Sequence, residues 1–329
     1  MRVAIVGCGL IGRKRAAALG AHRLVACADV SLSNAERLAA GHPDCVASSD
    51  YREVARRPDV DAIIVATTND ALTPAALAAV EAGKHVLVEK PAARNAAELR
   101  PLRDAAERHE VVVKVGFNHR FHPAFQKARA IVDDGGIGEL LYIRARYGHG
   151  GRPGYDREWR ADPRIAGGGE LLDQGVHLID LARWFCGEFV EVAGHVATYY
   201  WRMSVEDNGF ALLKTADGRV AWLHASCTEW KNLFSFEIFG RDGKLQIDGL
   251  GGSYGTERLT FYRMLPEMGP PETSAWEYPR EDRSWHAEVD HWAACIETGQ
   301  PPCGTVDDAL AALTIVERLY EVSGLDYHA

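Results

Sequence analysis

The first twelve residues, M-R-V-A-I-V-G-C-G-L-I-G (residues 1–12), decide the fold of the N-terminal half of this chain. The apolar run Val3–Val6 leads directly into a G-x-G-x-x-G pattern, and a helix-forming stretch follows it. Strand, glycine turn and helix in this order are typical of a dinucleotide-binding unit. Gly7 permits the tight turn, Gly9 lets the backbone approach a pyrophosphate, and Gly12 lets the helix pack closely on the strand.

The next apolar run sets the expected cofactor. Asp29 ends this run, roughly 20 residues after the glycines, where a carboxylate accepts hydrogen bonds from ribose hydroxyls and repels a 2′-phosphate. The sequence therefore predicts NAD in preference to NADP. A glycine turn that serves packing alone is the alternative, and the full strand–turn–helix–strand–Asp context argues against it. The loop residues expected to contact the cofactor are Gly7, Gly9, Leu10, Ile11 and Gly12.

Residues 1–118 alternate short apolar runs with amphipathic stretches rich in Ala, Leu and Glu. Near-continuous apolar runs suit parallel strands that are covered on both faces. The pattern predicts a doubly wound parallel sheet, and we assign residues 1–118 to a dinucleotide-binding Rossmann domain. The expected strands are Val3–Val6, Leu24–Ala28, Ala62–Ala66, His85–Val88 and Val111–Val115, and the expected helices are Ile11–Leu19, Ser33–Ala40, Ala71–Ala82 and Ala96–His109.

The pattern changes in residues 119–329. Turn sequences A-D-G-R and R-D-G-K separate several strand-like runs and favour antiparallel hairpins. We expect an α+β domain with a large, mostly antiparallel, open-faced sheet for substrate binding and oligomerisation, with a loop at Met264–Pro279. The expected strands are Leu140–Tyr147, Val190–Tyr200, Phe210–Thr215, Arg219–Thr228, Phe234–Phe239, Lys244–Ile247 and Leu259–Tyr262, and the helices are Pro123–Val132, residues 170–185, Trp285–Glu297 and Val306–Val322.

Composition excludes several classes of function. The 329 residues carry a net charge of −9, which argues against broad binding to nucleic acids or membrane surfaces. The seven cysteines form no C-x-x-C pair, so we predict neither a metal site nor a disulfide framework. No apolar run reaches the roughly 18 residues of a membrane span. A reducing cytoplasm is the expected setting.

The stretch E-L-L-D-Q-G-V-H-L-I-D-L-A-R-W-F (residues 170–185) predicts a buried helix that carries polar groups in its middle. Asp173 and His177 are four residues apart, so on an α-helix they share one face. Such a pair is often only a local hydrogen bond or a structural feature. An imidazole, with an ordinary pKa of about 6.5, is also a suitable proton acceptor near neutrality.

Four motifs together resemble one family of NAD(P)-dependent oxidoreductases, the glucose-fructose oxidoreductase / inositol dehydrogenase / rhizopine-catabolism (Gfo/Idh/MocA) family. They are G-C-G-L-I-G at 7–12, T-T-N at 67–69, E-K-P at 89–91 and G-G-G-E-L-L-D-Q-G-V-H at 167–177. The resemblance implies a Rossmann domain, an open-faced sheet domain and a site between them. It places Thr67 and Asn69 beside the cofactor. Many members read T-P-N-x-x-H at the second motif, whereas this chain has Thr68 and Leu72.

The resemblance also implies catalytic roles for Lys90, Asp173 and His177. Glu89 and Lys90 would approach the nicotinamide, and Lys90 would reach the reacting hydroxyl, where an ammonium stabilises a developing alkoxide. His177 would accept the hydroxyl proton while Asp173 orients the imidazole. Asp180 is a further expected partner of His177. Gly175 would make room for the substrate, and the Lys90–Pro91 peptide can be cis in similar proteins.

Two further stretches suggest binding residues. In F-N-H-R-F-H-P (117–123), we expect Asn118 to contact the cofactor and Arg120 the substrate, with the two histidines in solvent or core contacts. Residues 144–164 hold six arginines against three acids, in a glycine-rich stretch that suggests a loop. We expect Tyr155, Trp159 and Arg160 to bind a substrate with many hydroxyl groups, which is either neutral or anionic. The alternative is that these arginines pair with the protein's own acids.

The predicted function is hydride transfer between NAD and a secondary hydroxyl or ketone of a cyclic polyol, sugar or sugar derivative. One alternative is an enzyme that keeps NAD bound and uses it transiently in a net non-redox reaction. Another is a dehydrogenase-like protein that senses nucleotide or sugar. Because residues 220–227, V-A-W-L-H-A-S-C, place large groups on both faces of a strand, an apolar sheet face needs a partner. We therefore expect a homodimer or homotetramer.

Overall fold

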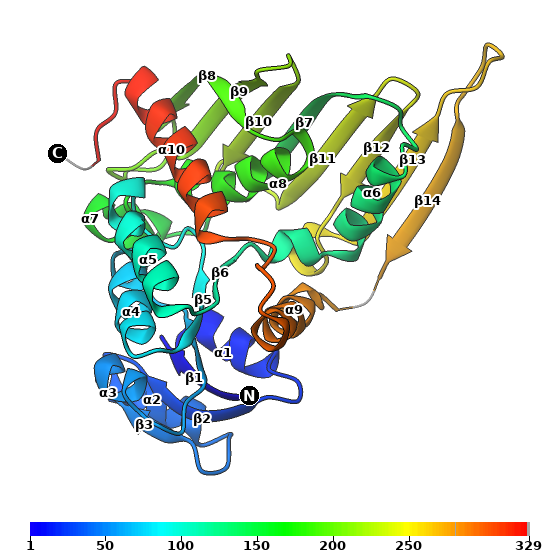
Figure 1. Cartoon of the computed structure of the whole chain (residues 1–329). Helices are drawn as coiled ribbons and strands as arrows, with labels where there is room; N and C mark the ends of the chain where they lie inside the picture. The colour runs from blue at the N-terminus through cyan, green and yellow to red at the C-terminus, as the bar shows by residue number, and fades with distance from the viewer. Residues whose placement is uncertain (280, 328–329) are drawn as a thin grey trace. The chain divides into compact units, whose positions relative to one another are not determined.

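The computed structural model describes residues 1–279 and 281–327 (Figure 1). The chain separates into two compact units. Unit 1 comprises Met1–Phe117, Arg164–Gly167 and Trp285–Thr314, and unit 2 comprises Asn118–Pro163, Gly168–Ser284 and Ile315–Ala329, of which the last two residues lie outside the described part.

Unit 1 is built on a six-stranded sheet in the order β3-β2-β1-β4-β5-β6, in which every pair is parallel. The order reverses between β1 and β4, which is the point where open α/β sheets bind ligands at the carboxyl ends of their strands. The expected Rossmann architecture is confirmed. The strands are β1 (Arg2–Val6), β2 (Arg23–Ala28), β3 (Val46–Ser48), β4 (Ala62–Val65), β5 (His85–Glu89) and β6 (Val113–Gly116).

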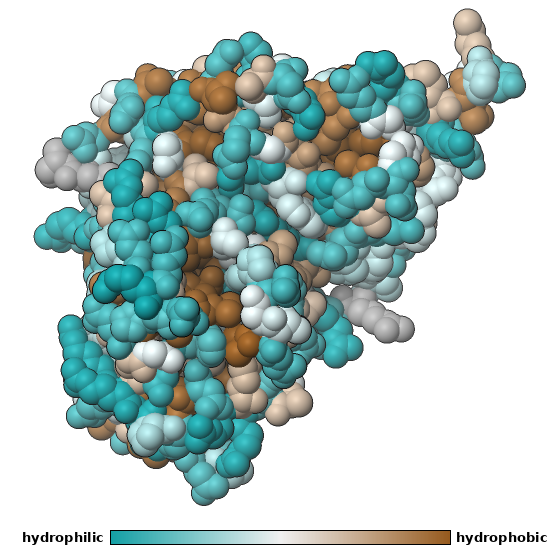
Figure 2. Space-filling view, in the orientation of Figure 1, coloured by the Kyte–Doolittle hydropathy of each residue, from teal (hydrophilic) through white to brown (hydrophobic). Residues whose placement is uncertain are grey.

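Helices connect these strands and bury their apolar faces on the sheet. They are α1 (Leu10–Ala17), α2 (Leu32–Ala39), α3 (Tyr51–Ala55), α4 (Asn69–Glu81) and α5 (Ala96–His109). Their outer surface is polar: in the space-filling view, the visible surface over α4 and α5 is mostly hydrophilic (Figure 2).

The sequence did not predict β3 or α3. Strand β3 is an edge strand of three partly exposed residues, so it has no apolar run to signal it.

Unit 2 contains an eight-stranded sheet in the order β14-β13-β12-β11-β7-β10-β9-β8. Only the β7–β10 pair is parallel, which confirms the mostly antiparallel sheet. The strands are β7 (Leu140–Gly148), β8 (Phe189–Ala197), β9 (Asn208–Thr215), β10 (Val220–Ser226), β11 (Leu233–Gly240), β12 (Gly243–Asp248), β13 (Glu257–Arg263) and β14 (Glu272–Tyr278).

Strand β14 corrects the expected loop at Met264–Pro279. It pairs antiparallel with β13, with Trp276 opposite Leu259. Its residues alternate between exposed and partly exposed, because an edge strand has one neighbour and little core to cover. The polar alternation therefore resembled a loop more than a strand.

Helices α6 (Pro123–Asp133) and α8 (Val176–Cys186) pack on one face of this sheet, α8 over β7 and β10. On β10 the side chains of Ala221, Leu223 and Ala225 face this core and are buried. The opposite face exposes Trp222 by 39% and leaves Val220 only partly covered. This alternation gives the sheet one covered and one open face, as expected for an antiparallel sheet.

The units are not consecutive pieces of chain, unlike the expected division at residue 118. The short helix α7 (Pro163–Ala166), helix α9 (Ser284–Thr298) and helix α10 (Val306–Val322) all contribute residues to unit 1. The physical reason is clear for α9. Its Val289 and Trp292 are fully buried in the same hydrophobic cluster as Val3 and Ile64 of the Rossmann sheet.

Candidate functional site

The glycine loop of unit 1 is fixed by contacts that exclude side chains. Gly7 has a φ of +92°, and a Cβ there would lie 2.4 Å from the Ala66 carbonyl oxygen. A Cβ on Gly12 would lie 1.9 Å from the Gly7 carbonyl oxygen. By contrast, a Cβ on Gly9 would meet nothing within 4 Å, so Gly9 faces open space at the start of α1. The loop therefore combines two packed glycines with one that leaves the backbone approachable.

The same loop has the features that a dinucleotide pyrophosphate requires. No side chain caps α1, whose N-cap residue is Gly9, so the first backbone N–H groups of the helix are not taken by a capping side chain. Those groups and the positive end of the helix dipole attract phosphate. Leu10 is 64% exposed and Ile11 is partly exposed beside this end. These residues fit the pyrophosphate of NAD.

Asp29 follows β2 and is held by the glycine loop. One carboxylate oxygen accepts a hydrogen bond from the Cys8 backbone N–H at 2.8 Å. The other accepts from the Ser31 N–H at 2.9 Å and from the Asn34 amide at 3.2 Å. Each oxygen can accept more than one hydrogen bond. The carboxylate is therefore oriented by its neighbours and retains acceptor capacity for ribose hydroxyls.

The remaining predicted residues of unit 1 lie at the ends of β4 and β5. Thr67 follows β4, and Asn69 begins α4, where its amide donates to the Ala166 carbonyl at 2.8 Å. Leu72, at the position of the family's histidine, is fully buried and so belongs to the core. Glu89 ends β5 and Lys90 follows it, with a cis Lys90–Pro91 peptide. Parallel strands end at one edge, so these residues share that edge with the glycine loop.

In unit 2, the expected helix 170–185 begins with a wider turn. Leu171–Gly175 form a π-helical turn and α8 continues from Val176. π-turns are rare and frequent at functional sites. Asp173 lies in the centre of this turn, where its carboxylate pairs with Arg160 Nε at 3.2 Å. Gly175 lies against the sheet, because a Cβ there would be 3.2 Å from Ala225 Cβ; it does not open the space that the sequence suggested.

His177 is buried and stacks on His119, which was expected in solvent or core contacts and not in the candidate site. The rings of His177 and His119 are 3.8 Å apart at an angle of 20°. His119 Nδ1 also lies 3.1 Å from Asn118 Oδ1, and Tyr147 lies 5.4 Å from the His119 ring. His119 comes from the F-N-H-R-F-H-P stretch, and the high density of polar side chains there was the only available signal.

Further polar side chains surround Asp173 and His177. We define the His177 cluster as His119, Tyr147, His149, Tyr155, Arg160, Glu170, Asp173 and His177, all within unit 2. His149 Nε2 lies 3.5 Å from Glu170, and its ring lies 5.5 Å from that of Tyr155. Glu170 and Tyr155 are buried. A cluster of imidazole, hydroxyl, guanidinium and carboxylate groups suits a ligand with many hydroxyls.

Electrostatics within the cluster shift several pKa values. Burial alone would lower the pKa of His149, but the nearby carboxylates of Glu170 and Asp173 outweigh it and raise that pKa. Burial and the same carboxylates raise the pKa of the Tyr147 and Tyr155 hydroxyls. Both tyrosines therefore stay protonated and can donate a hydrogen bond.

Two predicted binding residues have strong partners inside unit 2. Arg120 is buried and makes a bidentate pair with Asp180, at 2.8 and 2.6 Å. Asp180, which was expected beside His177, is engaged by this pair. Asn118 donates to Ser284 Oγ at 2.9 Å. These placements favour structural roles, and the binding roles of Asn118 and Arg120 stay predictions.

Three of the six arginines of residues 144–164 pair with the protein's own acids. Arg144 pairs with Glu237, Arg152 with Glu158, and Arg160 with Asp173. The Arg160 guanidinium also lies 4.5 Å from the Trp159 ring, which is a cation–π contact. The alternative stated for this stretch is thus observed for three of its arginines.

Among residues 1–279 and 281–327, no group of three or more His, Cys, Asp or Glu side chains could hold a metal ion. Within those same residues, no helix is long and apolar enough to cross a membrane.

Comparison with known proteins identifies the family. Residues 1–117 match an oxidoreductase family with an NAD-binding Rossmann fold, and residues 125–246 match the GFO/IDH/MocA C-terminal domain. A levoglucosan dehydrogenase from Pseudarthrobacter phenanthrenivorans is 31% identical over 283 residues, which cover 74% of this chain and 73% of that protein. The chain belongs to the GFO/IDH/MocA family of oxidoreductases. Its N-terminal part is therefore an NAD-binding Rossmann domain.

Other dehydrogenases are similar over nearly the whole chain. A scyllo-inositol 2-dehydrogenase (NAD(+)) from Bacillus subtilis is 27% identical and covers 96% of this chain and 92% of its own. A solved levoglucosan dehydrogenase in complex with NADH and levoglucosan superimposes with a TM-score of 0.90. It is 24% identical and covers 98% of this chain and 97% of that one, which supports the fold. This protein is thus an oxidoreductase whose relatives are named for sugars and polyols.

Proposed function

We propose that this protein oxidises one secondary hydroxyl of a neutral cyclic polyol or sugar with NAD, or reduces the corresponding ketone. The observation that carries the proposal is the buried His177, which stacks on His119 inside a cluster of tyrosine, arginine and carboxylate groups. The named activities of the relatives, a levoglucosan dehydrogenase and a scyllo-inositol dehydrogenase, support the substrate class.

Lys90, Asp173 and His177 carry the chemistry in this proposal. NAD, when bound, would supply the hydride acceptor for the alcohol carbon. The imidazole of His177 accepts the hydroxyl proton, and the ammonium of Lys90 donates a hydrogen bond to the oxygen as negative charge develops there. Asp173 favours the protonated imidazole by its charge. Tyr155 and Arg160 bind other hydroxyls of the ring.

The pairing of the arginines favours a neutral substrate over an anionic one. Arg160 faces Asp173 at 3.2 Å and Glu158 at 3.9 Å, so its positive charge is already opposed by two carboxylates. A phosphate or carboxylate on the substrate would have to compete with both. A sugar hydroxyl needs only the remaining N–H groups of the guanidinium, which has five donors.

The test is a substrate screen read as NADH absorbance, with inositols, levoglucosan, free aldoses, sugar phosphates and uronates. We expect turnover on one neutral ring compound. Lys90→Ala and His177→Ala should each lower kcat by about 10²–10⁴-fold, the usual worth of acid–base groups, while NADH binding by fluorescence stays within a few-fold. Full activity in either variant would reject the assigned roles. A net non-redox reaction would instead give product without stoichiometric NADH.

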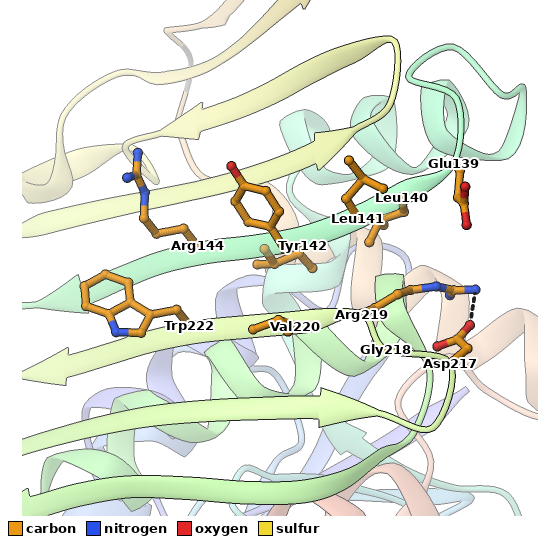
Figure 3. A pocket seen from close by; sticks show the side chains of 11 residues that line it. Glu139, Leu140, Leu141, Tyr142, Arg144, Asp217, Gly218, Arg219, Val220 and Trp222 are labelled. Carbon is orange, nitrogen blue, oxygen red and sulfur yellow. Dashed lines mark ion pairs between the residues drawn. The ribbon is translucent and has the colours of Figure 1, made fainter.

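We also propose that two copies associate through the open face of the unit 2 sheet, giving a homodimer or a homotetramer built from it. A groove of about 540 Å³ lies on this face between β7 and β10 (Figure 3). Tyr142 and Trp222 project from the neighbouring strands, and the Arg219–Asp217 pair closes one end. The exposed fractions of Leu141, Tyr142, Leu212 and Trp222 range from 39% to 49%.

A second copy is the favoured occupant, because the face offers apolar side chains beside balanced ion pairs such as Arg144 with Glu237. Such a face can pair with itself around a two-fold axis. Light scattering should give a mass of at least two chains, and Trp222→Glu should shift it toward one chain. A wild-type monomer at every concentration would reject this part of the proposal.

A further inference from the structure

Four charged side chains are buried together in unit 1. They are Arg15 on α1, Glu89 at the end of β5, Lys114 on β6 and Glu288 on α9, and none is more than 7% exposed. Arg15 Nε lies 2.5 Å from Glu89 and Arg15 Nη1 lies 2.7 Å from Glu288. Lys114 Nζ lies 3.2 Å from the second oxygen of Glu288. Two cations and two carboxylates thus balance in the interior.

Surrounding residues fix Arg15 at the centre of this group. The Trp285 ring lies 4.4 Å from its guanidinium, a cation–π contact supplied by the same helix as Glu288. A Cβ on Gly116 would lie 2.8 Å from Arg15 Nη2 and 3.1 Å from Glu89 Oε2, so glycine leaves space for both groups. Helix α9 therefore clamps Arg15 from one side while β6 leaves room on the other.

Stability alone does not explain such a group. Taking ions out of water is costly, and apolar replacements of similar volume are often as stable as a buried ion pair. The position of the group is more informative. Arg15 lies on the helix that starts at the glycine loop, and Glu89 directly precedes Lys90. The charge network thus joins the cofactor loop to the lysine assigned to catalysis.

Two cations lie near the Glu89 carboxylate. Burial raises its pKa, while the positive charges of Arg15 and, more weakly, of Lys90 lower it. Lys90 directly follows Glu89 in the chain, and its positive charge acts on this carboxylate. A buried carboxylate needs a charged partner. While Arg15 pairs with Glu89, that need is met; without Arg15, the Lys90 ammonium would be drawn to Glu89.

We propose that Arg15 is a positioning residue for Lys90: by holding the Glu89 carboxylate, it prevents that carboxylate from capturing the Lys90 ammonium. The Trp285 ring packs on Arg15 in this arrangement, and Glu288 balances the charges of Arg15 and Lys114. The inference rests on the proposed function for its effect on turnover. Its effect on the Lys90 amine can be measured without any substrate.

The experiment compares two charge-balanced double variants of the full chain. Arg15→Met/Glu288→Met removes the cation that holds Glu89. Lys114→Met/Glu288→Gln removes one cation and one carboxylate from the same group but leaves Arg15 on Glu89. The readout is the rate at which acetic anhydride acetylates the Lys90 peptide, measured by mass spectrometry, with Lys90→Ala to identify the peptide and circular dichroism to confirm folding.

We expect Lys90 labelling to fall about tenfold in Arg15→Met/Glu288→Met and to stay within about threefold of wild type in the control pair. Adding Glu89→Gln to the first variant should restore the labelling rate, because the capturing carboxylate is gone. Should the first variant not fold, Arg15→Lys keeps the charge but loses the planar fork, and should give a fall of about fivefold, between those of the control pair and the first variant.

An unchanged labelling rate would overturn the inference, and so would a fall that Glu89→Gln does not reverse. Turnover separates this result from the proposed function. If labelling behaves as expected and kcat falls in parallel, both stand. If labelling behaves as expected while wild type oxidises no polyol or sugar, the positioning role stands and the proposed function fails.

Discussion

The carboxyl edge of the unit 1 sheet and the His177 cluster of unit 2 differ in the chemical groups that form their surfaces. At the first, backbone groups and small residues form the surface, and Gly7 and Gly12 are held against carbonyl oxygens. At the second, long polar side chains from distant segments meet, such as His119 on His177 and Arg160 on Asp173. The contrast indicates that the glycine loop depends mainly on backbone shape, whereas the proposed substrate site depends on an arrangement of side chains.

The largest expected effect tests the backbone site with two alanine substitutions. Gly9→Ala should leave apo stability within about 0.5 kcal/mol, because its Cβ meets nothing, yet weaken NADH binding by about 100-fold or more by blocking the pyrophosphate. Gly12→Ala should destabilise the apo protein by about 1–3 kcal/mol, since its Cβ would overlap the Gly7 carbonyl. Denaturant unfolding and NADH fluorescence separate the two. If the two variants lost the same amount of stability and the same amount of NADH affinity, the proposed difference between Gly9 and Gly12 would be refuted.

The next effect concerns cofactor choice. Asp29→Asn removes the charge that opposes a 2′-phosphate, a repulsion of about 4 kcal/mol at 4 Å in a surface environment. The ratio of NADH to NADPH affinity should fall by at least about tenfold. Asp44→Asn is a matched control, because Asp44 is an exposed acid with a φ of +60°, which asparagine tolerates. A ratio that changes equally in both variants would remove Asp29 from cofactor selection.

In unit 2, a smaller effect is expected from Arg160. Arg160→Ala should raise KM by about tenfold for neutral and phosphorylated rings alike, because it removes hydrogen-bond donors that either ring can use. Arg152→Ala, which removes an exposed arginine paired with Glu158, should change KM less than twofold. Steady-state kinetics with neutral and with phosphorylated rings measure both KM changes. A loss confined to phosphorylated rings would favour the anionic substrate instead.

The last expected effect is on stability and depends on pH. Glu206 is fully buried beneath the π-turn, where it accepts hydrogen bonds from the Gly169 and Leu171 N–H groups and from Tyr320. Burial raises its pKa from 4.5 to about 7. Between these values the folded chain keeps a proton that the unfolded chain releases, so stability falls as pH rises, by at most about 1.4 kcal/mol per unit.

Glu206→Gln should remove this part of the pH dependence. In thermal unfolding followed from pH 5 to pH 8, the wild-type Tm should decline by a few degrees more than that of the variant. Parallel Tm curves for the two proteins would show that Glu206 does not titrate in this range. The result bears on the cluster because Glu206 anchors the turn that carries Asp173.

The same contrast explains what the sequence could predict. Gly7, Gly9, Gly12 and Asp29 could be predicted as a candidate site because a dinucleotide loop is local and its spacing is nearly constant. The stacking of His119 on His177 could not be predicted, since it depends on how two segments 58 residues apart pack. The π-turn at Leu171–Gly175 was missed for a related reason, because hydrophobic periodicity alone predicts an ordinary α-helix there.

Contacts between segments that are far apart in the sequence could not be predicted either. Helix α9 was predicted correctly as a helix, but Trp292 and Glu288 gave no sign that they would be buried in the Rossmann unit. Edge strands β3 and β14 lack the apolar runs that identify central strands. Helices and strands could thus be predicted where a run of apolar residues marks them in the sequence. They could not be predicted where their burial or pairing depends on a distant segment.

The central claim is that Lys90 and His177 act on the same hydroxyl, and a double-mutant cycle tests it most directly. Lys90→Ala, His177→Ala and the double variant are compared by kcat on the best substrate, with NADH binding as the control. Groups that act as a unit are strongly non-additive. We predict that the double variant is within a few-fold of the slower single variant. Losses that multiply would contradict the account, because they would show two independent contributions.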